Sequence, residues 1–219
     1  MQILRILGKL LISVGMGVLM FVGWTLWGTG FYYSDQQNDL RTEFDRIEVA
    51  VPVSDGPSGP PRGYAPRAGK PVFNLVIPAI KLDQIVVEGV GTEELRKGPG
   101  HYPECRPGFS KPLCTEFDEA WPGEKGRVIV SGHRTTYGAP FWDLDKLKRG
   151  DEVITKTKWG RFTYTVTKKS IVRPDSLAIA VPSNNREIVL TTCNPRFSAS
   201  QRLVVFAEMK EALAMSDRT

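Results

Sequence analysis

The chain has 219 residues, of which 41% are hydrophobic and 24% are charged, and its formal net charge is +5. This composition is ordinary for a globular protein and excludes wholesale disorder, and the length allows one domain of usual size with an appendage. The positive charges are scattered, with no basic stripe interleaved with aromatic residues, which argues against a nucleic-acid-binding protein.

The N-terminal region predicts a membrane anchor. Arg5 and Lys9 precede a run from residue 10 to residue 34 that contains no charged side chain, and about 20 apolar residues suffice to cross a bilayer core. Aromatic residues gather at the far end of this run, as in an interfacial belt: Trp24, Trp27, Phe31, Tyr32 and Tyr33. A cleaved signal peptide is the alternative, but its apolar core spans only about 7–15 residues, and no clear A-x-A cleavage site follows.

We therefore expect residues 1–34 to form a cytoplasmic tip and a single transmembrane helix. The few Lys and Arg residues that flank the run favour a cytoplasmic N-terminus and an extracytoplasmic remainder, since orientation follows these residues and not the acids. The expected localisation is the cell membrane, with one span.

Residues 35–71 are predicted to form a stalk. Residues 35–50 have a pattern that suits a short helix, and the segment after them, VPVSDGPSGPPRGYAPRAGKP, is rich in proline and glycine. Such a composition cannot bury a core and is typical of an extended, semi-rigid spacer. The folded domain is then expected over residues 72–219.

The folded domain shows repeated strand patterns. Two short apolar runs flank a turn in VFNLVIPAIKLDQIVVEGV, and further runs follow at residues 126–134, 151–159, 160–173, 187–193 and 202–209. Helical patterns are confined to residues 92–97 and 141–147. Short strands with Gly/Pro turns predict a mostly antiparallel β-barrel or sandwich.

Two of the three cysteines lie close together in the Pro-rich stretch YPECRPGFSKPLCTEF. In an oxidising compartment Cys105 and Cys114 can form a disulfide that closes a small loop, which contributes about 2–3 kcal/mol in the chain-entropy view. A zinc set of His101, Cys105, Cys114 and His133 is the alternative, although the spacing matches no familiar zinc finger. His101 can equally be a packed loop residue.

The remaining thiol, Cys193, ends a strand pattern. It can be a buried structural residue, because a free cysteine packs like a small hydrophobe. If residues 187–193 and 202–209 are neighbouring antiparallel strands, the connection returns Arg202 beside Cys193, and a cation there favours the thiolate and stabilises an anionic intermediate. His133 follows another strand pattern and can supply the proton transfers that a cysteine nucleophile needs. Together they predict a covalent amide-transfer site.

These motifs resemble the sortase family, most closely its class E members. The stretches that carry the resemblance lie in family order from Asn74 to Met209: NLVIPAIKLDQIVVEGV, GPGHYP, VIVSGHRTTYGAPF followed by LDKLKRGDEV, and LTTCNPRFSASQRLVVFAEM. The resemblance implies a mostly β fold, a closed eight-stranded β-barrel with short helices, preceded by a single transmembrane helix. It also implies a membrane-bound cysteine transpeptidase, for which we expect no cofactor and no metal.

The resemblance assigns roles to five residues. Cys193 is the expected nucleophile, His133 the expected general acid and base, and Arg202 the expected oxyanion-stabilising cation. Thr192 and Tyr102 are expected to contact the substrate.

The resemblance also names the substrates. Such enzymes cleave an LPxTG-like C-terminal sorting signal between Thr and Gly, and class E relatives are similar in favouring LAxTG. The acyl group then passes to an amine of a peptidoglycan precursor or a pilin. The expected partners are therefore secreted proteins with that signal, the amine acceptor and the lipid bilayer.

The sequence departs from the family pattern in two places. Val189 stands where the family usually has threonine, and the insertion CRPGFSKPLC follows GPGHYP. The insertion lies near His101 and Tyr102 and can alter the substrate preference but not the reaction. Two other functions stay open: a cysteine peptidase that passes the acyl group to water, and a membrane-tethered binding module in which Cys193 is inert.

Overall fold

The computed structural model describes residues 2–24, 28–48, 59–116, 120–176, 179–181 and 183–214. Trp27 of the predicted aromatic belt and residues 51–58 of the predicted stalk lie outside these ranges. The elements in chain order are α1 (Gln2–Gly23), α2 (Thr29–Arg46), β1 (Pro71–Ile77), η2 (Pro78–Ile80), β2 (Leu82–Glu88), α3 (Thr92–Leu95), β3 (Gly100–His101), β4 (Gly126–Ser131), η3 (Leu144–Lys146), β5 (Glu152–Lys156), β6 (Gly160–Val172), β7 (Arg186–Asn194) and β8 (Gln201–Ala214).

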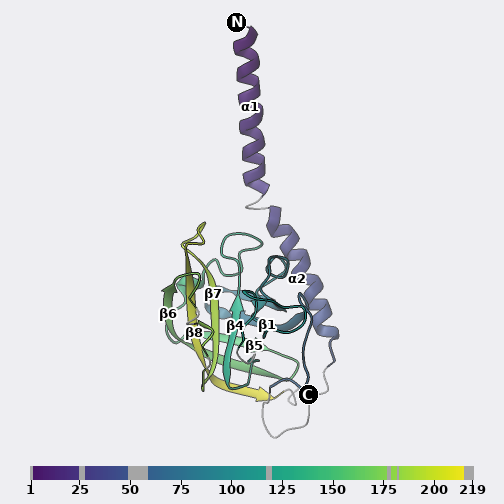
Figure 1. The fold of residues 1–219 in the computed structure, drawn as a ribbon, viewed down its shortest axis with the longest axis vertical. Coiled ribbons are helices and arrows are strands. Elements are labelled where there is room, and N and C mark those ends of the chain that lie inside the picture. The colour runs from purple at the N-terminus through teal and green to yellow at the C-terminus, as the bar shows by residue number, and fades with distance from the viewer. Residues whose placement is uncertain are drawn as a thin grey trace.

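The eight strands close into a barrel in the order β1-β2-β3-β4-β7-β8-β6-β5 (Figure 1). This confirms the closed eight-stranded barrel that the family resemblance implied, and of the two folds that the strand patterns allowed it is the barrel and not the sandwich. Most neighbouring pairs are antiparallel, but β2 pairs with β3, and β4 with β7, in parallel. The short strand β3 was not expected from the sequence, because two residues carry no periodic pattern.

The barrel interior holds the main hydrophobic core. Side chains alternate between the two faces of a strand, so Phe73, Leu75 and Ile77 of β1 point inward, and all three are fully buried. The ring of Trp159, at the turn between β5 and β6, is also buried there, and its indole N–H donates to the carbonyl oxygen of Pro122 at 2.9 Å. Alternating β-branched and aromatic residues thus build both the strands and the core.

Helix α1 fits the predicted anchor in length and composition but ends earlier than expected. Within the described part of the chain it is the one helix long and apolar enough to cross a membrane, and none of its residues is buried. The sequence analysis extended the anchor to residue 34, whereas the structure ends α1 at Gly23 and starts α2 at Thr29. Since Tyr33 is only 5% exposed, the last uncharged residues belong to a helix that packs against protein.

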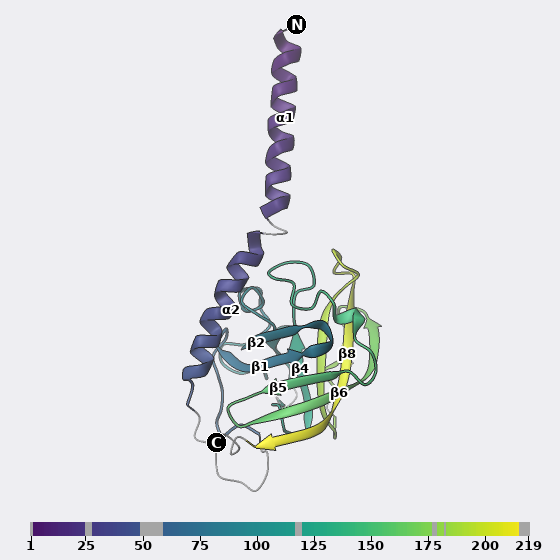
Figure 2. The same ribbon diagram turned by 180° about the vertical axis from the view of Figure 1, so that it is seen from behind.

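Helix α2 lies against the outside of β1 and β2 (Figure 2). Leu40 and Phe44 are buried on Ile85 and Val87 of β2. Gln37 accepts a hydrogen bond from the backbone N–H of Ile85 at 2.8 Å and donates one back to its carbonyl oxygen at 3.1 Å. The first part of the predicted stalk is therefore a docked helix. The prediction of an extended spacer concerns the Pro/Gly-rich residues after α2, of which residues 51–58 lie outside the described ranges.

We predict that Leu40→Ala loosens α2 from the barrel. Removal of a buried leucine side chain lowers the free energy of unfolding by about 2 kcal/mol or more. Here the removed side chain belongs to the face of α2 that packs on β2, so the substitution weakens the contact between α2 and the barrel. Limited proteolysis of the full chain in detergent measures it as faster cleavage within residues 29–46. Asn38→Asp, on the exposed face of the same helix, is the control. Equal cleavage rates in both variants contradict the docking of α2.

Candidate active site

Strands β7 and β8 place a thiol opposite a cation. In their antiparallel register Cys193 pairs with Arg202, and Asn194 pairs with Gln201. Directly opposite residues put their side chains on the same face of a sheet, so the side chains of Cys193 and Arg202 leave the sheet on the same face. Cys193 is free and half-buried, and the guanidinium of Arg202 donates to the carbonyl oxygens of Ala199 and Gln201 at 2.9 and 3.0 Å. The structure thus pairs in register the two positions that the sequence analysis paired.

The segment that carries His133 is bonded to the same end of β7. Strand β4 runs parallel to β7, and just beyond β4 the N–H of Gly132 donates to the carbonyl oxygen of Thr191 at 3.1 Å. The hydroxyl of Thr192 donates to the carbonyl oxygen of Gly132 at 2.7 Å. The backbone of His133 is therefore tied to the two residues that precede Cys193.

The environment of His133 favours its neutral form. Its Nε2 atom is buried and has no hydrogen-bond partner among the described residues. Burial lowers the pKa of the His133 imidazole below its ordinary value, and the positive charge of Arg96 lowers it further. The ring stacks obliquely on Tyr137, with 5.2 Å between the ring centroids. A neutral imidazole with an unpaired nitrogen can take a proton from a thiol or an amine and later return it.

Arg134 lies beneath this site, a position that was not predicted from the sequence. Its side chain is only 4% exposed. Its guanidinium donates to the carbonyl oxygen of Cys193 at 3.3 Å and to Oδ1 of Asn194 at 2.6 Å, and it pairs with Asp145 at 3.2 Å. It therefore fixes the backbone at the end of β7, a role for which no local sequence pattern exists.

An apolar surface lies on the outside of the barrel, on the face of β7 that also carries Cys193, and its centre is covered by neighbouring side chains. Its buried centre and the half-buried residues packed around it are Ile129, Val189, Val204, Tyr102, Val172, Ile179, Ala180 and Phe206. Val189 and Cys193 lie four residues apart on β7 and so share a face. Val189, which departs from the family pattern, is part of this surface and is fully buried.

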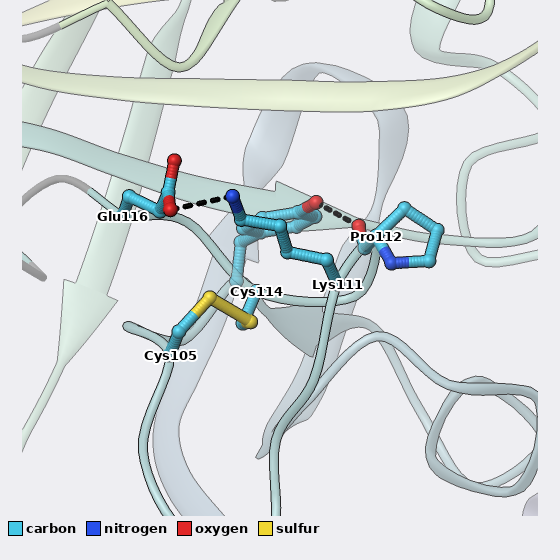
Figure 3. Close-up of a disulfide and its surroundings, with 6 residues drawn as sticks. Cys105, Lys111, Pro112, Cys114 and Glu116 are labelled. Atoms are coloured by element: carbon cyan, nitrogen blue, oxygen red, sulfur yellow. Dashed lines mark hydrogen bonds and ion pairs between the residues drawn. A yellow bond between two sulfur atoms is a disulfide. The ribbon is translucent and has the colours of Figure 1, made fainter.

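The insertion after β3 borders this surface. A disulfide joins Cys105 to Cys114, whose Cα atoms lie 4.9 Å apart (Figure 3). The hydroxyl of Tyr102 donates to the carbonyl oxygen of Pro112 inside the loop that the disulfide closes. The loop is thus held against Tyr102, at the edge of the apolar surface.

The base of this loop is fixed by a buried charge network that includes His101. Arg106 donates to one carboxylate oxygen of Glu88 at 2.6 Å, and Nδ1 of His101 lies 2.9 Å from the other. His101 is 1% exposed, so it packs inside the fold. The disulfide uses both thiols of the alternative zinc set, and the described residues contain no cluster of three or more His, Cys, Asp or Glu side chains suited to a metal ion.

Comparisons with known proteins agree with this geometry. The profile of the sortase domain matches residues 75–210. Sortase SrtE1 of Streptomyces coelicolor is 28% identical over 218 residues, which cover 94% of this chain and 57% of that protein. Sortase D of Bacillus subtilis is 31% identical over 150 residues, which cover 66% of this chain and 67% of that protein.

One solved structure extends the comparison to three dimensions. The crystal structure of sortase E1 from Streptomyces coelicolor with a tripeptide in the active site has a TM-score of 0.58 at 27% identity, and the match covers 71% of this chain and 97% of that chain. The chain spans little more than half the length of the first curated relative described above.

We predict that Arg96→Ala raises the pKa of His133. The substitution removes a neighbouring positive charge that disfavours the imidazolium, while the larger effect of burial remains. An NMR titration of the imidazole C2 protons measures this shift, and the chain has only two histidines to assign. Lys97→Ala, which removes the adjacent cation, is the control and leaves the pKa unchanged. An unchanged or lowered pKa in Arg96→Ala refutes this electrostatic interpretation.

Proposed function

The chain belongs to the sortase family, and we propose that it is a membrane-anchored cysteine transpeptidase with Cys193, His133 and Arg202 as its catalytic residues. The register that pairs Cys193 with Arg202 carries this proposal. The hydrogen bonds that tie the His133 segment to the same end of β7 support it. The chain thus has a nucleophile, a proton carrier and an oxyanion-stabilising cation on adjoining strand ends, as acyl transfer requires.

The proposed substrate is an extended peptide with a sorting signal of the LAxTG or LPxTG type. The half-buried apolar side chains that cover the outer face of β7, Val172 and Phe206 among them, offer a track for the apolar first residues of such a signal. Similarity to sortase SrtE1 and to the peptide-bound sortase E1 favours the class E preference for LAxTG. Tyr102, which lies beside this track, is the proposed contact for the second signal position.

The proposed role of Thr192 is less direct than that of Tyr102. Its side chain is 3% exposed and alternates with Cys193, so it points toward the barrel interior. Its hydroxyl already donates to Gly132. We therefore propose that Thr192 supports the site by joining β7 to the His133 segment, and its direct contact with substrate stays a prediction.

The reaction follows from these positions. The sulfur of Cys193 attacks the carbonyl carbon of the signal threonine, and Arg202 stabilises the oxyanion that forms. The carbon–nitrogen bond to glycine then breaks, His133 gives the leaving amine its proton, and a thioester with Cys193 remains. An incoming amine attacks this thioester, His133 takes the proton that the amine loses, and the new amide leaves the free thiol.

The partners and the localisation belong to the same proposal. The acceptor is an amine of a peptidoglycan precursor or a pilin, and the donors are secreted proteins that carry the signal. Helix α1, which is largely apolar and has no buried residue, is the proposed bilayer anchor. An extracytoplasmic barrel fits the disulfide between Cys105 and Cys114, because such bonds persist in oxidising compartments.

We predict that the full chain in detergent joins an LAxTG peptide to triglycine and that Cys193→Ala abolishes the product. Arg202→Ala lowers kcat by about 100-fold or more, since it removes an oxyanion donor. Arg196→Ala, which removes a cation of the same β7–β8 connection that pairs with Asp145, serves as the matched control. Product analysis by mass spectrometry also separates transfer from hydrolysis. Ligation by Cys193→Ala would falsify the proposal, and hydrolysis alone at saturating amine identifies a peptidase.

We predict that the disulfide loop sets peptide affinity. The double variant Cys105→Ser, Cys114→Ser releases the loop that holds Pro112 on Tyr102, so KM for the peptide rises several-fold while kcat changes little. Peptide-concentration series of the transfer rate measure both constants. Glu116→Gln, which removes an exposed ion pair with Lys111 but keeps the loop closed, is the control. An unchanged KM in the double variant shows that the loop does not contact the peptide.

A further inference from the structure

We propose that helix α2 is a positioning element of the active site, in which Tyr33 and Gln37 hold the two chain segments that carry Tyr137 and Arg96, the residues stacked beside His133. This inference rests on the proposed function, in which His133 carries the protons. It assigns a task to the segment that directly follows the membrane anchor, and it names the residues that perform the task.

Tyr33 supports the loop that follows His133. Its ring packs on Gly138 so closely that a Cβ atom at Gly138 would lie 2.2 Å from Cδ1 of Tyr33. Gly138 also has a φ of +68°, so both the close approach and the backbone conformation require glycine. The hydroxyl of Tyr33 donates to Oε1 of Gln84 at 2.9 Å, which fixes the ring on β2.

Gln37, one helical turn further along α2, supports the segment that carries Arg96. Its amide nitrogen donates to the carbonyl oxygen of Lys97 at 2.8 Å, and a Cβ atom at Gly98 would lie 2.5 Å from the same nitrogen. The same amide group is bonded to both backbone groups of Ile85. With all these partners and only 8% exposure, Gln37 fixes the turn after α3 to the barrel.

The two segments held by α2 meet at the ring of Tyr137. Arg96, which precedes Lys97, lies over this ring at 5.5 Å from its centroid. Tyr137, which precedes Gly138, stacks on His133. Each backbone position held by α2 is thus next in sequence to a residue of the Arg96–Tyr137–His133 stack.

This arrangement has a consequence for the reaction. The position of the His133 ring depends on Tyr137, and the charge that disfavours its protonated form comes from Arg96. Displacing a catalytic group by about 1 Å can cost about 100-fold in rate without weakening substrate binding. Loss of the α2 contacts therefore acts on kcat, and peptide binding on the far side of Cys193 stays intact.

The test compares three variants of the full chain in detergent with an LAxTG peptide and triglycine. Tyr33→Ala lowers kcat by about tenfold or more with KM within about twofold. Tyr33→Phe retains the ring on Gly138 and restores kcat to within about twofold. Trp159→Phe, the matched control, alters a buried ring of the barrel core that lies outside α2, beside Gly160 and so at the opposite end of β6 and β8 from Arg202. It lowers the melting temperature, as Tyr33→Ala does, but leaves kcat unchanged.

The outcomes separate this inference from the proposed function. If wild-type transfer depends on Cys193 but Tyr33→Ala and Trp159→Phe lose kcat equally, or neither loses it, the positioning role is overturned and the transpeptidase stands. If the wild type shows no Cys193-dependent transfer, the proposed function fails. The NMR signal of His133 then decides the inference: a shift in Tyr33→Ala and none in Trp159→Phe supports it, and equal spectra overturn it.

Discussion

The hydrogen-bond register of β7 with its two neighbours is the constraint on which the rest of the structure depends. On one side β7 pairs in parallel with β4, which leads into His133, and on the other it pairs with β8, which begins beside Arg202. A slip of one residue in the second pairing would turn the arginine to the opposite face of the sheet from the thiol. The core resists such a slip, because Leu190 and Val205, which pair in the same register, are fully buried.

The same register decides which side chains of β7 build the core and which lie on the side of the thiol. Residues an odd number of positions from Cys193 point into the barrel interior, whereas residues an even number of positions away lie on the outer apolar surface. Arg134 joins the two sides, since its buried guanidinium holds the carbonyl oxygen of Cys193 and the side chain of Asn194. A barrel built this way can vary its loops, such as the one closed by the disulfide, while the reactive strand ends stay fixed.

The sequence predicted the features that have local patterns. Strand periodicity predicted a β-barrel or sandwich, and the short connection after residue 193 predicted the β7–β8 hairpin with its Cys193–Arg202 pair. The closed eight-stranded barrel was predicted from the family resemblance. The docking of α2 was not predicted, because Tyr33 lies in an uncharged run that resembles a membrane span, and its partners Gln84 and Gly138 lie far away in the sequence. The burial of Arg134 has no local pattern either, because it results from three segments that meet only in the fold.

The most direct test of the account is the mass of the acyl-enzyme. Full-length protein is mixed with an LAxTG peptide without an amine acceptor, quenched in acid and digested, and the fragment that contains Cys193 is weighed. The account predicts that this fragment gains the mass of the peptide up to its threonine, joined through a thioester that hydroxylamine removes. A peptide cleaved between Thr and Gly with no such adduct, or an adduct on a residue other than Cys193, would contradict it.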